Sequence, residues 1–244
     1  MKLNIFFTAG FVENATTLEI IQALEQNGAD LVEVGMPYSD PVVDGPVIQK
    51  ANQIAIQNGM KISKLFKELE GLKTKVKIPV ILMGYLNPVL QYGIEKFCED
   101  AENVGVHGVI IPDLPPHAYE KDYKSIFERH KLNFSFILTP QTDNQRMKYL
   151  DELSNGFVYA VSNNSVTGNT LQHHEQEAYF TRLKEFKFKN ECYVGFGIRE
   201  KKDLEYLSQF VDGGIIGSAF MRHLAQNKNN ALKAIPIFMK ALKD

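Results

Sequence analysis

Cysteine is scarce in this sequence, and so are the features that would place it in a membrane or outside the cell. The two cysteines, Cys98 and Cys192, lie too far apart to match a metal-binding or redox spacing. We therefore expect buried thiols in a reducing compartment. No apolar run is long enough to span a bilayer, and the first residues lack a signal-peptide pattern. These absences predict a cytoplasmic protein.

An excess of positive charge is also missing. The formal net charge is −2 and the pI is near 6.3, so no basic field favours nucleic acid or an anionic membrane as a partner. The densest lysine run, Lys184 to Lys189, is interleaved with aromatic residues. This pattern is typical of the solvated face of a helix rather than of a binding patch.

Short apolar runs alternate with longer amphipathic segments along the whole chain. The expected strands are Leu3–Phe7, Leu31–Val34, Val80–Met83, Val109–Ile111, Phe134–Leu138, Phe157–Val161, Tyr193–Phe196 and Gly214–Ile216. The expected helices are Thr17–Gln26, Val47–Asn58, Ile62–Lys73, Ile94–Val104, Tyr119–His130, Asn144–Leu153, Ala178–Phe186, Lys201–Gln209 and Phe220–Leu242.

Eight strand–helix units of about 30 residues each predict an α/β protein with a parallel sheet. Such units most often close into a single (β/α)8 barrel, with the active site at the carboxyl ends of the strands. No linker divides residues 1–244, so we expect one domain. An open doubly wound sheet is the alternative, but the first strand–helix turn lacks a Gly-x-Gly-x-x-Gly fingerprint.

Two connections are longer than a barrel needs, which indicates working loops. They run from Gly35 to Pro46 and from Asn163 to about Glu177. No lysine stands at the carboxyl ends of the expected strands, which argues against Schiff-base chemistry. No cluster of His, Asp and Glu stands there either, which argues against a metal site. Acid–base chemistry by carboxylates remains.

Glu33 is the most informative acid because it lies inside an apolar strand. A buried carboxyl is costly, and desolvation should raise its pKa. The alternative is a Glu that points outward or pairs with a lysine. Asp44 precedes Gly45-Pro46 and is either a turn residue or a second catalytic acid. Asp113, flanked by prolines, fits a rigid turn as well as catalysis.

Glycine-rich segments end the seventh and eighth expected strands. They are Gly195–Ile198 and Gly213–Ser218, and a helix is expected after each. Barrels build phosphate sites there from backbone N–H groups and a helix N-terminus. Thr167-Gly168 in the second long loop could close over the same anion. The combination favours a phosphorylated substrate.

Several of these motifs together resemble the tryptophan synthase α subunit family. They are Phe7–Gly10, Glu33–Pro46, Val166–Gly168, Gly195–Ile198 and Gly217-Ser218. The resemblance implies a (β/α)8 barrel that cleaves indole-3-glycerol phosphate to indole and glyceraldehyde 3-phosphate in tryptophan biosynthesis. It also implies a β-subunit partner in an α2β2 complex. Pyridoxal phosphate is expected only in that β subunit, and no cofactor in this chain.

The resemblance assigns a role to each matching residue. Glu33 and Asp44 match the catalytic acids. The indole pocket is assigned to Phe6, Met83, Tyr159 and Phe196; the phosphate site to Gly168, Gly197, Gly217 and Ser218; and the β-subunit interface to Asp40, Asn87 and Pro88.

This assignment gives the two acids different tasks. Protonation of indole C3 turns the ring into an electron sink for the breaking C–C bond. We expect Glu33, with a raised pKa, to deliver that proton. We expect Asp44, with an unraised pKa, to stay ionised and accept the indole N1–H.

The sequence also departs from the family pattern. Asn163 and Ser165 stand where the family often has Arg and Gly, so a guanidinium that could clamp the loop is missing. Phe11-Val12 replaces a common Asp-Pro. Three alternatives remain open: a stand-alone lyase that releases indole, a weakly catalytic module that activates the β subunit, and another phosphate-binding barrel such as a sugar-phosphate isomerase.

Overall fold

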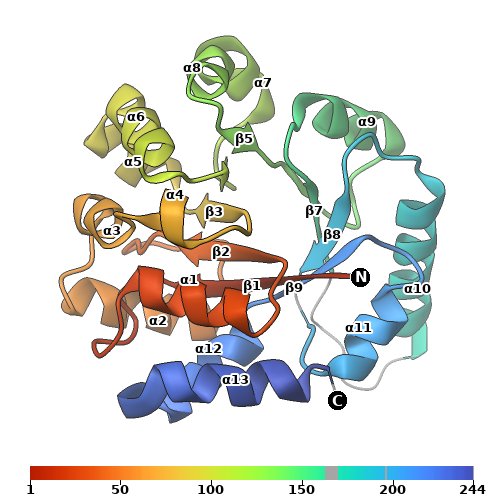
Figure 1. Ribbon diagram of the computed structural model, residues 1–244. Helices are drawn as coiled ribbons and strands as arrows, with labels where there is room; N and C mark the ends of the chain where they lie inside the picture. Colours follow the sequence, from red (N-terminus) through yellow and green to blue (C-terminus); the bar gives the residue numbers. More distant parts are fainter. Residues whose placement is uncertain (163–169, 196, 244) are drawn as a thin grey trace.

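The computed structural model describes residues 1–162, 170–195 and 197–243 (Figure 1). Its strands are β1 (Lys2–Thr8), β2 (Leu31–Gly35), β3 (Val80–Met83), β4 (Gly108–Ile110), β5 (Asn133–Phe134), β6 (Ile137–Leu138), β7 (Val158–Val161), β8 (Cys192–Gly195) and β9 (Gly213–Ile216). Its helices and helical turns are α1 (Thr17–Gln26), α2 (Pro46–Gln57), α3 (Ile62–Glu68), α4 (Leu72–Lys75), α5 (Leu86–Tyr92), α6 (Ile94–Val104), α7 (Pro116–Ala118), η1 (Tyr119–Tyr123), α8 (Lys124–Arg129), α9 (Asn144–Leu153), α10 (Thr170–Glu185), α11 (Lys201–Leu207), α12 (Ser218–Gln226), η2 (Lys228–Asn230) and α13 (Ala231–Ala241).

The strands form one parallel sheet that closes on itself. Their order is β5-β4-β3-β2-β1-β9-β8-β7-β6, and its two ends, β5 and β6, are separated by only Ser135 and Phe136. The amide of Ser135 donates to Val109 O at 3.2 Å, and the Phe136 carbonyl accepts from Tyr159 N at 3.0 Å. The expected strand Phe134–Leu138 is therefore divided because it changes partner, from β4 to β7, along its length. The predicted (β/α)8 barrel is confirmed.

The helices lie around the sheet (Figure 1), and several differ from the expected ranges. The expected helix Ile62–Lys73 is interrupted before Gly71, whose φ of 90° lies in the left-handed region. The expected helix Phe220–Leu242 is divided into α12 and α13 by η2. Helix α5 was not expected at all. It ends at Gly93, whose φ is 95°.

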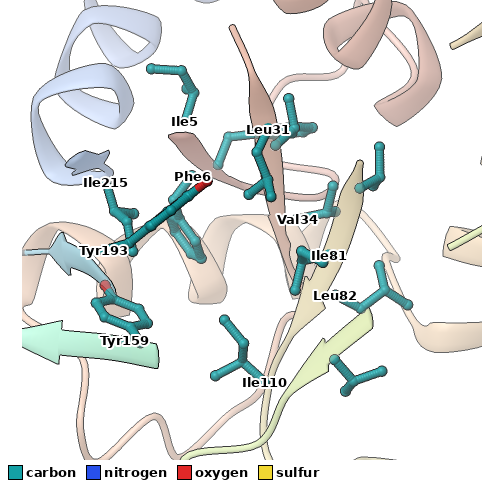
Figure 2. Close-up of a cluster of buried hydrophobic side chains, with 14 of the residues drawn as sticks. Ile5, Phe6, Leu31, Val34, Ile81, Leu82, Ile110, Tyr159, Tyr193 and Ile215 are labelled. Atoms are coloured by element: carbon teal, nitrogen blue, oxygen red, sulfur yellow. The ribbon is translucent and has the colours of Figure 1, made fainter. Parts of the chain in front are cut away.

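The barrel interior is filled by side chains from alternate strand positions. Phe6, Tyr159, Tyr193 and Ile215 come from four strands and lie together in it (Figure 2). Because neighbouring residues in a strand face opposite sides, Asn4 and Thr8 share the inward face with Phe6. Within the described ranges, no helix combines the length and apolar character needed to cross a membrane.

Candidate active site

Glu33 lies at the centre of β2 and points into the barrel. All five residues of β2 are buried, and Glu33 has an exposed fraction of 0%. In the sheet register it stands between Phe6 of β1 and Ile81 of β3. Its Oε1 accepts a hydrogen bond from Asn4 Nδ2 at 2.5 Å. Its Oε2 is buried and has no hydrogen-bond partner among the described residues.

This environment favours the protonated form of Glu33. Burial raises the pKa of its carboxyl from 4.5 to about 8, against the opposing effect of the Asn4 hydrogen bond. At neutral pH the carboxyl therefore carries a proton that it can donate. The expected raised pKa at Glu33 is confirmed.

Asp44 stands in the loop between β2 and α2, immediately before the Gly45-Pro46 start of that helix. Its Oδ2 accepts from Tyr85 Oη at 3.1 Å and from Asn52 Nδ2 at 3.5 Å. Burial raises its pKa, although both donors oppose the shift. The expectation of an unraised pKa was wrong, because packing around the loop covers the carboxyl. Asp44 nevertheless accepts hydrogen bonds from two donors, which favour its carboxylate form, whereas Glu33 accepts from one.

The loop that carries Asp44 is fastened by Tyr85. The same Tyr85 Oη that donates to Asp44 accepts from Val43 N at 3.2 Å, and its ring lies 5.2 Å from that of Tyr38. Tyr85 and Asn52 were missed in the sequence. The only sequence signal was a polar residue on the buried side of each segment, which also fits ordinary packing.

A cavity of about 230 Å³ opens beside the two acids. Its lining includes Phe6, Asp44, Met83, Tyr159, Ile198, Ile215, Gly197, Gly217, Ser218, Arg199 and Arg222. Glu33 is not among the lining residues, but its strand neighbour Phe6 is. Burial and the charges of Glu33 and Asp44 raise the pKa of Tyr159 well above its usual value, so both acids act on one side chain of this cavity.

Three of the four residues assigned to the phosphate site are described, and all three line this cavity. Gly217 is the N-cap of α12, and Ser218 is its first residue. The first N–H groups of a helix have no acceptor within it and are free to bind an anion. Arg222, one turn further along α12, also lines the cavity and was missed. Its spacing of four residues from Ser218 was the available signal.

The residues assigned to a partner interface lie near the rim. Asn87 Nδ2 donates to Tyr38 Oη at 3.3 Å, which joins α5 to the loop after β2. Asn87 and Asp40 are exposed, and Pro88 is half-buried. Val42 and Leu90, on the same two segments, are 78% and 45% exposed. The structure therefore brings polar and apolar surface together here.

Some sequence-based assignments lie elsewhere or cannot be placed. Gly168 and Phe196, like Asn163 and Ser165, fall outside the described residues. Asp113 lies in a turn, and its Oδ1 accepts a hydrogen bond from Leu86 N, at the start of α5, at 2.9 Å. No grouping of His, Cys, Asp and Glu in the described ranges could hold a metal ion.

Comparison with known proteins identifies relatives of this chain. The family model for the tryptophan synthase alpha chain matches residues 2–243. The tryptophan synthase alpha chain of Christiangramia forsetii is 45% identical over 241 residues, covering 98% of this chain and 94% of that one. The alpha chain of Flavobacterium psychrophilum is 46% identical over 226 residues, covering 92% and 89%. A chain of the tryptophan synthase a2b2 complex from Pyrococcus furiosus superposes with a TM-score of 0.88 at 27% identity, covering 99% and 97%.

Proposed function

The chain belongs to the tryptophan synthase alpha chain family of lyases in tryptophan biosynthesis, and from this premise we propose that Glu33 and Asp44 cleave indole-3-glycerol phosphate. The products are indole and glyceraldehyde 3-phosphate. The observation that carries the proposal is the fully buried Glu33 carboxyl, with a pKa of about 8, next in the sheet to Phe6, which lines the same cavity as Asp44.

The cavity offers suitable surfaces for both ends of this substrate. Phe6, Met83 and Tyr159 line it with apolar and aromatic surface that suits an indole ring, and we assign Phe196 to the same pocket. Gly197, Gly217 and Ser218 line it too, and they are assigned to the phosphate together with Gly168. Binding both ends fixes the ring and the glycerol chain relative to the acids.

The reaction then requires one proton transfer from Glu33 to the substrate and a second from the substrate back to Glu33. Glu33 donates its proton to indole C3, and Asp44 accepts the N1–H and stabilises the positive charge that develops in the ring. Carboxylate Glu33 next takes the proton of the hydroxyl on the carbon attached to C3. That C–C bond breaks, its electrons return to the ring, and the hydroxyl carbon becomes the aldehyde. Glu33 ends protonated, as it began.

We further propose that this chain works without a cofactor of its own and that pyridoxal phosphate belongs only to a β-subunit partner. The protonated indole ring supplies the electron sink that the C–C cleavage requires. The α2β2 assembly is proposed because the structural relative from Pyrococcus furiosus is a tryptophan synthase a2b2 complex. Asp40, Asn87 and Pro88 are assigned to the interface, where the exposed Val42 and Leu90 add apolar surface. We also assign the whole chain, 1–244, to a single domain that acts in the cytoplasm.

Indole formation from indole-3-glycerol phosphate, measured with and without a purified tryptophan synthase β subunit, tests the proposal. We expect activity in the isolated chain and a higher rate in the complex. Strong activity that the β subunit does not change would indicate a stand-alone lyase. Activation of the β subunit without cleavage would indicate an allosteric module. Absence of both, with no binding of indole, would contradict the proposed function.

A further inference from the structure

Asn4 is an amide in the interior of the barrel, where an apolar side chain would pack at less cost. It has an exposed fraction of 0%, and it belongs to β1, whose residues after Lys2 are all buried. Its Nδ2 donates to Glu33 Oε1, while its Oδ1 is buried without a hydrogen-bond partner in the described part of the chain. A buried acceptor without a donor is rare and destabilising. This cost indicates that Asn4 has a role beside Glu33.

The side from which Asn4 contacts Glu33 indicates what this role is. Asn4 precedes Phe6 by two residues on β1, so it lies on the same inward face but nearer to the amino end of the strand. Phe6 lines the cavity, and so does Met83 at the carboxyl end of β3, whereas Asn4 does not. Asn4 therefore reaches Glu33 from the side away from the cavity. It occupies Oε1 and leaves Oε2 unpartnered.

The amide group also matches both protonation states of the carboxyl. An ionised Glu33 needs a donor, and Nδ2 is one. A protonated Glu33 can keep its proton on Oε2 and still accept the same hydrogen bond at Oε1. Leucine or valine at this position would offer no donor.

We propose that Asn4 is a positioning residue, which holds Glu33 through Oε1 so that Oε2 is the oxygen that exchanges protons with the substrate. This inference rests on the proposed function and deepens it. Tyr159 from β7 and Asp44 from the loop after β2 are the titratable groups that share this space, and both stay unchanged in the variants below.

The test uses Asn4→Leu and the isosteric Asn4→Asp in the full chain. Ser135→Ala is the matched control, since it also removes a buried hydrogen bond, from Phe157 N, but has no contact with Glu33. Indole formation from indole-3-glycerol phosphate is followed across pH. Loss of the Asn4 donor should move the alkaline limb of kcat/KM upward by about one pH unit. It should also lower kcat by about tenfold and leave KM within about twofold.

Asn4→Asp should move the same limb upward because a second carboxyl opposes ionisation of Glu33. Ser135→Ala should keep the wild-type limb. A limb that stays at the wild-type position in both Asn4 variants, or a raised KM with unchanged kcat, would overturn the inference.

An infrared titration keeps this result separate from the proposed function. The protonated carboxyl band of Glu33 is isolated by subtracting the spectrum of Glu33→Gln, and its midpoint should rise by about one unit in Asn4→Leu. This measurement needs no activity. Wild-type protein that makes no indole would refute the proposed function alone, whereas an unmoved midpoint would refute the role of Asn4.

Discussion

Replacing Glu33 by glutamine should make the fold more stable in alkaline solution while it removes activity. Glu33 is fully buried and has a folded-state pKa of about 8, raised from 4.5 by desolvation. Between these two pH values the folded chain keeps a proton that the unfolded chain releases. The contribution of Glu33 to stability is therefore complete below pH 4.5 and is lost as the pH rises to 8.

The size of the effect follows from the shift. Each pKa unit corresponds to about 1.36 kcal/mol, so the rise from 4.5 to about 8 is worth on the order of 5 kcal/mol. Glutamine is neutral and nearly isosteric, and its Oε1 can accept the same hydrogen bond from Asn4 Nδ2. The variant should equal wild type within about 1 kcal/mol at pH 5 and exceed it by several kcal/mol at pH 8.5. Its kcat for indole formation should fall by about a hundredfold or more.

Urea denaturation at intervals from pH 5 to pH 8.5 measures the free energy of unfolding of both proteins. Buried tyrosines and cysteines other than Tyr159 contribute equally to the two proteins and cancel in the difference. Tyr159, whose pKa is raised well above its usual value, stays protonated over this pH range. Glu152→Gln replaces an exposed glutamate and should keep the wild-type pH dependence. A difference between Glu33→Gln and wild type that is independent of pH would refute the buried, raised-pKa description of Glu33.

Three other substitutions test neighbouring parts of the site. Tyr85→Phe removes the hydroxyl that donates to Asp44 and accepts from Val43 N. It should lower kcat by about tenfold in steady-state kinetics and the free energy of unfolding by about 1 kcal/mol in urea denaturation. Unchanged kinetics would show that Asp44 does not need the Tyr85 hydrogen bond. Gly195→Ala places a Cβ within 2.6 Å of three atoms of the Tyr159 side chain, so it should cost about 1–3 kcal/mol of stability and lower kcat/KM. Full activity would contradict the packing. Arg222→Ala should raise KM by about fivefold and leave kcat unchanged. Arg146→Ala, at a residue outside this cavity, should leave KM unchanged. Equal KM values for the two variants would show that Arg222 does not contribute to binding the phosphate.

The strands and the buried acid were predictable from the sequence because their signals are local. Apolar, β-branched runs mark each strand, and Glu33 interrupts one of them. The break at Gly71 and the division of α12 from α13 were not predicted, because apolar periodicity continues across both. The change of partner within Phe134–Leu138 depends on barrel closure, which no single segment encodes.

The partners of the two acids were harder to predict. Tyr85 reaches Asp44 from a different strand–helix unit, so the contact depends on the path of a loop that has no periodicity. Burial in that loop raises the pKa of Asp44, contrary to the sequence-based expectation, and the Tyr85 hydrogen bond opposes the rise. Asn4, like Glu33, is a polar residue within an apolar strand, which is a signal that the sequence contains. The hydrogen bond between them depends on how β1 and β2 pair, which the sequence does not show.

Whether the two acids carry out the cleavage is tested most directly by comparing indole formation from indole-3-glycerol phosphate by wild type, Glu33→Gln and Asp44→Asn under identical conditions. We predict that wild type releases indole and that each variant is slower by about a hundredfold or more, with the fold intact. Release of indole by either variant at near wild-type rate would contradict it.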